Sequence, residues 1–228
     1  MWRLTLLSGA IWAQFSSPNS FAALSVAAVA PSGSTMAKGL TYPTSGHALT
    51  GAGIGFQVHA FIASYVSLNL RFSQSFFPLD ARSLGRDGAL FPDRVRISQN
   101  PTISHTQGGL GVGTGLKLDW VSFYVPLQLA FGIYSAPEIE GERDAARAWI
   151  SPKFSTFQLG LSTGLITNFT ISNNFFLGVS LLFTSLRSGE KEFERNRYTF
   201  GVMDRQFIYR STVPTDLVEL GALVGITF

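Results

Sequence analysis

Residues 121–134 read Val-Ser-Phe-Tyr-Val-Pro-Leu-Gln-Leu-Ala-Phe-Gly-Ile-Tyr, and every odd position of this stretch holds a large apolar side chain. The even positions hold small, polar or aromatic residues. A period of two is that of a β-strand, whose successive side chains point to opposite faces, whereas a helix repeats every 3.6 residues. The stretch therefore predicts a strand with one face that is apolar along its whole length.

The same alternation recurs in both directions along the chain. Apolar residues occupy nearly every second position in the segments 54–62, 66–72, 110–118, 157–169, 175–183 and 218–228. A weaker example is 21–30, where Leu24, Val26 and Ala28 share one side. Together with 121–134, these segments predict eight strands.

The connections between these strands alternate strictly between short and long. Short turns are predicted at 63–65, 119–120 and 171–174, and long loops at 31–50, 78–105, 135–153 and 187–217. The long loops hold all of the charged residues except Arg3, Arg71, Lys117, Asp119 and Glu219. The stretches between the loops are therefore almost free of charge, as in a membrane protein.

The composition excludes several classes of protein. Charged residues make up 14% of the 228 positions, against about 25% in soluble proteins, and 20 residues are Phe. This apolar content excludes a disordered chain. The absence of Cys excludes a disulfide scaffold and a thiolate zinc site, and a net charge of +3 does not indicate nucleic acid binding. The period of two argues against a helical membrane protein.

These features predict an all-β fold, namely a transmembrane antiparallel up-and-down β-barrel of eight strands. A bilayer offers no partner for the backbone groups of an open sheet edge, so the sheet must close. Bacterial barrels have short periplasmic turns and long extracellular loops. We therefore expect the bacterial outer membrane as the location, with both termini in the periplasm. If the segment 198–209 also enters the bilayer, the barrel has ten strands.

Aromatic residues are distributed as the two interfacial belts of a membrane protein require. Trp120, Phe123, Phe169 and Phe175 lie beside the short turns, and Phe131 lies toward the long loops. We expect these five side chains to face the two surfaces of the bilayer.

The N-terminus has the pattern of a secretory signal. A basic start in residues 1–3 precedes an apolar run of about ten residues that ends at Trp12. We expect cleavage after Ala13, with Ala22 as the alternative end of the signal. The remaining residues, 14–228, are expected to form a single barrel domain.

The signal, the eight segments, the charged loops and the terminal Phe228 resemble the small eight-stranded outer-membrane β-barrel family, which includes OmpA-, OmpX- and OmpW-like proteins. In that family the last strand carries an assembly signal, with a terminal aromatic residue and an apolar residue two positions earlier. Phe228 and Ile226 match it, whereas the family's Gly five positions before the end is Leu223 here. The resemblance implies two kinds of partner, the barrel-assembly machinery and outer-membrane lipid with lipopolysaccharide.

The inward rows predict a cluster of charged and polar residues in the lumen. This cluster comprises Arg71, Lys117, Glu219, His59, Gln128 and Tyr124. Because charges inside a membrane barrel need partners, we expect Arg71 to pair with Glu219. Many inward positions hold Gly, which makes room for larger side chains in a narrow lumen; a narrow channel is the alternative. Pro126 cannot donate to the ladder, so we expect a local bulge there.

One pair of neighbours, Ser104 and His105, is placed at the outer rim where a nucleophilic pair would act in an enzymatic barrel. No acidic residue is placed to orient this histidine. We therefore expect no catalytic activity, and no motif indicates a metal or a cofactor.

The loops carry structure of their own. The last long loop alternates over 198–202, which predicts a hairpin above the membrane with its turn at Asp204 and Arg205. Other loops hold apolar residues that predict a hydrophobic mouth or a contact surface, namely Leu90, Phe91 and Trp149. A structural or interaction role through the loops is therefore expected, with an envelope protein as a candidate partner. The alternatives are an OmpW-like conduit for small apolar solutes and an accessory subunit of an envelope or secretion complex.

Overall fold

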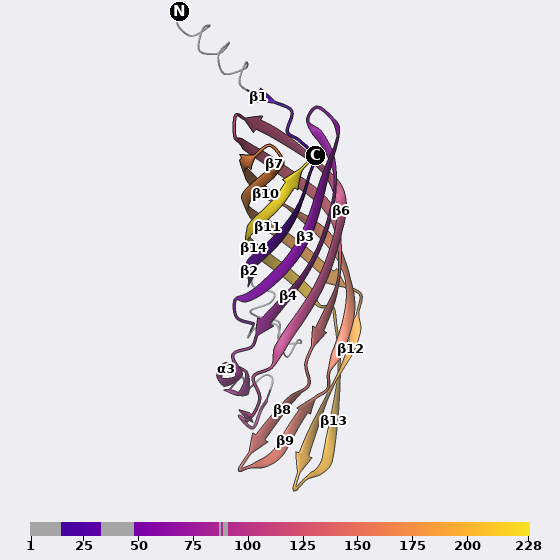
Figure 1. The fold of residues 1–228 in the computed structure, drawn as a ribbon. Coiled ribbons are helices and arrows are strands. Elements are labelled where there is room, and N and C mark those ends of the chain that lie inside the picture. Colours follow the sequence, from indigo (N-terminus) through magenta and orange to yellow (C-terminus); the bar gives the residue numbers. More distant parts are fainter. Residues whose placement is uncertain (1–14, 33–47, 87, 89–90) are drawn as a thin grey trace, which may run out of the picture.

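The computed structural model describes residues 15–32, 48–86, 88 and 91–228. Within these residues the chain forms one short helix and fourteen strands, named as in Figure 1. Their bounds are β1 Phe15–Ser16, β2 Phe21–Pro31, β3 Gly51–Ala63, β4 Val66–Pro78, α3 Ala81–Arg86, β5 Arg96–Ile97, β6 Thr102–Leu118, β7 Val121–Ala136, β8 Ile139–Arg143, β9 Ala146–Ser151, β10 Phe154–Ser172, β11 Phe175–Ser188, β12 Lys191–Thr199, β13 Val202–Ser211 and β14 Pro214–Thr227.

Eight of these strands close into an antiparallel barrel (Figure 1). Around the barrel they follow the order β2, β3, β4, β6, β7, β10, β11 and β14. Pairing of β14 with β2 closes the wall. The barrel is therefore up-and-down, and the prediction of eight strands is confirmed because the hairpin of the last loop lies in a separate sheet.

The three predicted short turns are present and lie at one end of the barrel. They join β3 to β4, β6 to β7 and β10 to β11. Asp119 has a φ of 53°, the left-handed conformation that the favoured two-residue hairpin turns require. The C-terminus lies at the same end, beside the start of β2, where Phe228 N donates to Ser20 O at 3.0 Å.

The barrel strands extend beyond the segments that the sequence predicts. β7 continues to Ala136 and β6 begins at Thr102, so the predicted long loops at 78–105 and 135–153 are too wide. The outward residues change near these ends from apolar to polar, as at Ser135 and Ser155, whose hydroxyl oxygens lie 2.8 Å apart. The apolar alternation ends there although the backbone pairing continues, so the periodicity marks the apolar belt and not the whole strand.

The predicted bulge at Pro126 is absent. Pro126 lies opposite Gly113 in β6, and the register between β6 and β7 does not shift. On the other side, the ladder between β7 and β10 is interrupted between Thr163 and Ile166 and resumes in the same register. Thr163 Oγ1 donates to Pro126 O at 2.8 Å. The missing N–H of Pro126 is thus accommodated by a gap in the ladder and a side-chain bond.

Five strands form a second sheet at the far end of the barrel from the termini (Figure 1). Its order is β13, β12, β9, β8 and β5. The hairpin of β8 and β9 continues from β7 and β10, and the hairpin of β12 and β13 continues from β11 and β14. This second sheet, which we call the outer sheet, therefore prolongs one side of the barrel wall.

The hairpin of β12 and β13 is present, but its predicted turn is wrong. The chain turns at Phe200 and Gly201, whose φ values of 52° and 78° are left-handed. Asp204 lies in β13 and pairs across the hairpin with Arg197 at 2.7 Å. The hydrogen bond from Arg197, with a further one from Thr199, holds the pKa of the Asp204 carboxyl below its usual value. Asp204 and Arg205 resemble a turn in sequence because these two adjacent charged residues separate the apolar residues before them from those after them.

The first described residues already belong to the end of the barrel. β1 pairs with β6, and Phe61 N donates to Ser20 Oγ at 2.9 Å. Phe21 is fully buried in the lumen, where its ring stacks on His59 at 4.6 Å. The segment 1–13 that the sequence predicts as a signal lies outside the described residues.

We expect the mature protein to begin at Gln14 and not at Ala23. Processing after Ala22 would remove Phe21 from the lumen and shorten β2 at the end where it pairs with β14. Intact-mass measurement of the protein extracted from membranes identifies the N-terminus directly. A mature chain that starts at Ala23 would contradict the role of Phe21 in the packing.

Candidate functional site: the lumen and the outer sheet

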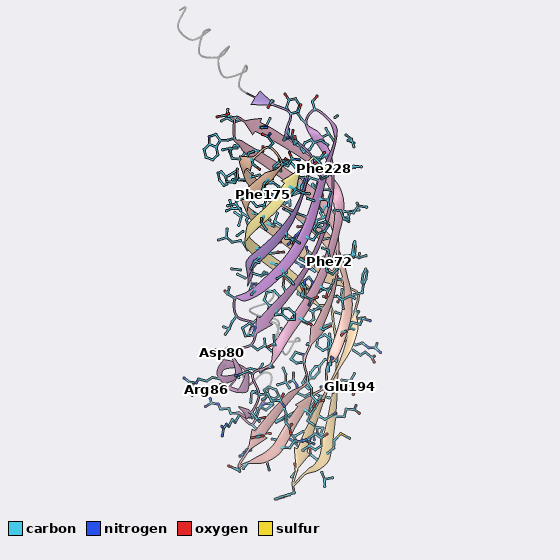
Figure 2. The ribbon with its side chains drawn as sticks, in the orientation of Figure 1. Phe72, Asp80, Arg86, Phe175, Glu194 and Phe228 are labelled. Atoms are coloured by element: carbon cyan, nitrogen blue, oxygen red, sulfur yellow. The ribbon has the colours of Figure 1, made fainter. Side chains whose placement is uncertain are left out.

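An apolar belt surrounds the barrel, because most outward side chains of the eight strands are apolar and many of them are large and exposed (Figure 2). On β11 the belt runs from Phe175 to Phe183, and the next outward residues are Ser185 and Arg187. Eight residue steps at about 3.3 Å, tilted by about 40°, cover roughly 20 Å along the barrel axis. This height is close to that of the apolar band of transmembrane β-barrels.

The predicted interfacial aromatics lie on this outer surface. Trp120 and Phe169 are neighbours at the turn end, with ring centroids 5.7 Å apart. Phe123 and Phe175 face outward near the same end. Phe131 lies farther along β7, and its ring covers Gly108, where a Cβ would approach it to 2.4 Å. The predicted assembly-signal residues are exposed as well: Ile226 lies on β14, and Phe228 directly follows the end of this strand.

The turn end of the lumen is filled by an apolar cluster. Its buried members are Phe21, Ala23, Tyr124, Ile166, Phe176, Leu182 and Leu223, with Phe61 packed against them. Tyr124 and His59, both predicted for the lumen, lie here and contact the Phe21 ring. Gly225 admits this packing, because a Cβ at that position would lie 2.5 Å from the Phe176 ring.

A polar layer occupies the middle of the lumen. Arg71 from β4 and Glu219 from β14 form an ion pair across it, with 6% and 4% of their side chains exposed. Gln128 Nε2 donates to Asn69 Oδ1 at 2.7 Å. The structure thus brings together three of the six residues predicted for the lumen in one layer. Lys117 is half-buried near the turn end, where it lies opposite Ser16.

Further side chains of this layer come from the same inward rows but were missed in the sequence. Gln107 Nε2 donates to Thr184 Oγ1 at 3.3 Å, and Thr184 Oγ1 donates to Ser162 Oγ at 3.0 Å. Gln158 Nε2 donates to Thr215 Oγ1 at 2.8 Å. The alternation of each strand already assigns these residues to the lumen, so register alone would have found them.

A second apolar cluster fills the end of the lumen nearest the outer sheet. Its buried members are Val29, Phe77, Leu79, Leu84, Phe91, Val95, Ile103, Tyr134, Ala136, Ile139, Ala148, Trp149, Phe193, Val213 and Leu217. Phe91 and Trp149 are therefore core residues and not an exposed mouth or contact surface. Their ring centroids lie 6.2 Å apart. Leu90, the third residue predicted for that mouth, lies outside the described residues.

The lumen is consequently occupied along its length by side chains. Apolar clusters fill both ends, and the middle layer holds a buried ion pair and buried amides. Exposed fractions of 5% for Arg71, 3% for Gln128 and 3% for Glu219 show that these side chains of the middle layer are shielded from solvent. Eight-stranded barrels have an interior just wide enough for such packing.

The pair formed by Ser104 and His105 is not a nucleophilic site. Both residues lie within β6, where consecutive side chains point to opposite faces. His105 points into the lumen and is buried, and Ser104 lies on the other face. The prediction that the two lie together at the outer rim is wrong, because β6 begins at Thr102 and not after His105.

The described residues include neither a group of side chains that could bind a metal ion nor a helix that could span a membrane. Among residues 15–32, 48–86, 88 and 91–228, no three His, Cys, Asp or Glu side chains are grouped as a metal ion would require. In the same part of the chain, no helix has the length and apolar content to cross a bilayer.

Solved structures share this architecture. A major outer membrane protein from Thermus thermophilus matches with a TM-score of 0.55 and 13% identity, over 92% of this chain and 100% of that chain. Outer membrane protein OprG from Pseudomonas aeruginosa matches with a TM-score of 0.53 and 8% identity, over 93% and 97%. The chain has the fold of the small outer-membrane β-barrels. The outer membrane protease OmpT from Escherichia coli also matches this barrel, with a TM-score of 0.45 and 9% identity over 94% and 98%.

These identities are low, so the likeness shows the fold of the barrel and nothing of its activity. No family model matches the chain. No curated protein matches it either.

Proposed function

We propose that the protein is a non-enzymatic barrel of the bacterial outer membrane that acts through its outer sheet. One observation carries this proposal: the lumen is filled at both ends, whereas the outer sheet projects beyond the belt. A filled lumen offers no path for a solute, so the part of the molecule available for function is the part outside the membrane.

The arrangement of the ends supports an orientation. The short turns and the C-terminus lie at one end of the barrel, and the outer sheet lies at the other (Figure 1). Transmembrane barrels of bacteria have short turns on the periplasmic side and longer loops outside. The termini then lie in the periplasm and the outer sheet faces the exterior.

The outer sheet has a free edge that suits protein contact. β13 is the last strand of the sheet and pairs only with β12 among the described strands. The tip of this hairpin exposes apolar side chains, with Phe200 fully exposed and Val202 and Met203 more than half exposed. An unpaired strand edge with apolar side chains favours addition of a strand from a partner. An envelope protein or a subunit of a larger envelope complex would be such a partner.

We expect the purified protein to be non-conducting in planar lipid bilayers. The two apolar clusters and the Arg71–Glu219 layer leave no open path along the axis. Recordings at 1 M salt check this, with a general porin inserted in the same bilayer as the positive control. Reproducible conductance steps from the folded protein would favour the alternative of a conduit.

A further inference from the structure

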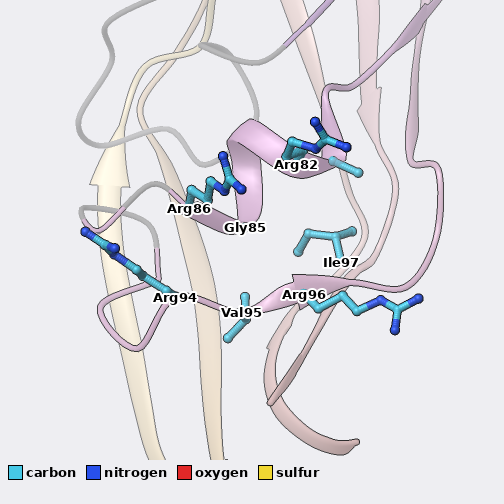
Figure 3. A pocket seen from close by; sticks show the side chains of 8 residues that line it. Arg82, Gly85, Arg86, Arg94, Val95, Arg96 and Ile97 are labelled. Atoms are coloured by element: carbon cyan, nitrogen blue, oxygen red, sulfur yellow. The ribbon is translucent and has the colours of Figure 1, made fainter. Parts of the chain in front are cut away.

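Four arginines line one cavity of about 780 Å³ at the outer end of the barrel (Figure 3). Arg82 and Arg86 come from α3, and Arg94 and Arg96 come from the segment that runs beside it. No Asp or Glu is among the described residues that line this cavity. Its described wall therefore carries four positive charges without a carboxylate.

Backbone contacts fix the two segments from which these arginines project. Val95 N donates to Gly85 O at 2.9 Å. A Cβ at Gly85 would lie 2.2 Å from Val95 O, so this close approach requires glycine. On the other side, a Cβ at Gly141 would lie 2.6 Å from Val95 Cγ2. Leu84 is buried in the second apolar cluster, the one nearest the outer sheet, and so holds α3 against the barrel. Asp80 Oδ1 accepts hydrogen bonds from the backbone N–H groups of Arg82 and Ser83 at the start of the helix. The arginines thus project from a packed base.

Three arginines elsewhere in the outer sheet have close acidic partners. The ion pairs are Arg147 with Glu140, Arg197 with Asp204 and Arg210 with Glu192. By contrast, within the part of the chain that the structure describes, none of the four cavity arginines forms an ion pair. Glu142 lies opposite Arg96 in the β5–β8 ladder, but the two side chains do not form an ion pair. Like charges that share a cavity repel each other, and an anion that enters relieves this repulsion.

The position of the cavity indicates which anions can reach it. Phe76, an outward residue of the belt, is half exposed, and α3 begins five residues later in the chain. Asp80 and Arg86 lie just beyond the part of the belt that includes Phe72 (Figure 2). In the proposed orientation this is the level of the outer headgroups. The placement rests on the proposed function, whereas the charge of the cavity does not.

We propose that this cavity binds a multivalent anion that carries phosphate groups. A guanidinium presents paired N–H donors that match two phosphate oxygens, which makes Arg the side chain suited to phosphate recognition. The four side chains point in different directions from two adjacent segments (Figure 3), so an anion with more than one phosphate group can engage several of them. Such an anion has two sources: phosphorylated headgroups of the outer leaflet, or a soluble polyphosphorylated molecule.

The first arm of the test measures binding of inorganic tripolyphosphate to the folded protein in an uncharged detergent by isothermal titration calorimetry. The triple variant Arg82→Gln/Arg86→Gln/Arg94→Gln is expected to bind at least about tenfold more weakly than the unchanged protein. The matched control, Arg147→Gln/Arg197→Gln/Arg210→Gln, removes the same charge from paired arginines and is expected to bind within about twofold. A triple Arg→Lys variant of the cavity keeps the charge and is expected to fall between the two.

The second arm measures lipopolysaccharide retained by the same variants in nanodiscs with and without this lipid. A loss confined to the cavity variant in either arm supports the proposal, and the arm in which it occurs identifies the source of the phosphate. Equal losses in the cavity and control variants, or no loss in either arm, overturn it. Unheated gel mobility verifies that each variant is folded. The conductance test of the proposed function uses the unchanged protein. A negative result in both binding arms therefore overturns the phosphate site without deciding the proposed function.

Discussion

Replacing Arg71 by Met is expected to destabilise the folded barrel by about 3–5 kcal/mol, because it leaves Glu219 charged and without its partner in the buried lumen. The double variant Arg71→Met/Glu219→Leu removes both charges and should recover most of this loss, as apolar replacements of buried ion pairs often do. Urea unfolding in phospholipid vesicles, followed by tryptophan fluorescence, measures the free energy of unfolding of each variant.

An exposed ion pair supplies the matched control. Arg187 and Asp216 form a bidentate pair on the outer surface, with 48% and 20% of their side chains exposed. Arg187→Met should change the free energy of unfolding by about 0–1 kcal/mol, because water solvates the remaining carboxylate. A cost below about 1 kcal/mol for Arg71→Met, or a double variant no more stable than the single one, would contradict a buried pair in a sealed lumen.

Replacing Leu127 by Arg is expected to cost about 2–4 kcal/mol, because this outward side chain lies near the middle of the belt, where a charge enters hydrocarbon. The matched control is Ile208→Arg on β13. The two side chains have similar exposed fractions, 54% for Leu127 and 59% for Ile208, and both lie on strands. Since Ile208 lies in the outer sheet, its replacement should change the free energy of unfolding by less than about 0.5 kcal/mol.

The same vesicle unfolding experiment measures both variants, and the fraction that inserts is read from unheated gels. Equal and small effects at the two positions would mean that water surrounds Leu127 as it surrounds Ile208. Equal and large effects would mean that the outer sheet also lies in the membrane, which would revive the ten-stranded alternative.

The alternation of residues determines much of this fold in advance. A strand that is apolar on one face must place that face toward lipid, so the register assigns Arg71 and Glu219 to the lumen together with the glycines that make room for them. The short turns follow in the same way, because two-residue connections such as that at Asp119 have recognisable residues. The number of strands, the order and the closure of the barrel are all consequences of these local signals.

The sequence did not predict the parts of the structure that lie outside the apolar belt, because apolar and polar residues alternate regularly only where one face of a strand contacts lipid. His105 lies in a strand segment whose outward residues are polar, so β6 is longer than its apolar row. Phe91 and Trp149 are buried by contacts between loops that are distant in sequence, which periodicity does not report. The cavity arginines escaped notice because the loops mix charges of both signs, and only packing at Gly85 brings these four together without a carboxylate.

Nitroxide accessibility tests the central arrangement most directly. The chain has no Cys, so a single Cys can be introduced and labelled at Leu127, Gln128, Leu129 or Ile208 without removing other sites. In lipid vesicles, labels at 127 and 129 should collide with oxygen and not with a water-soluble nickel complex, the label at 128 with neither, and the label at 208 with the nickel complex. Equal nickel access at 127, 129 and 208 would show that the outward rows face water, and the membrane barrel would be refuted.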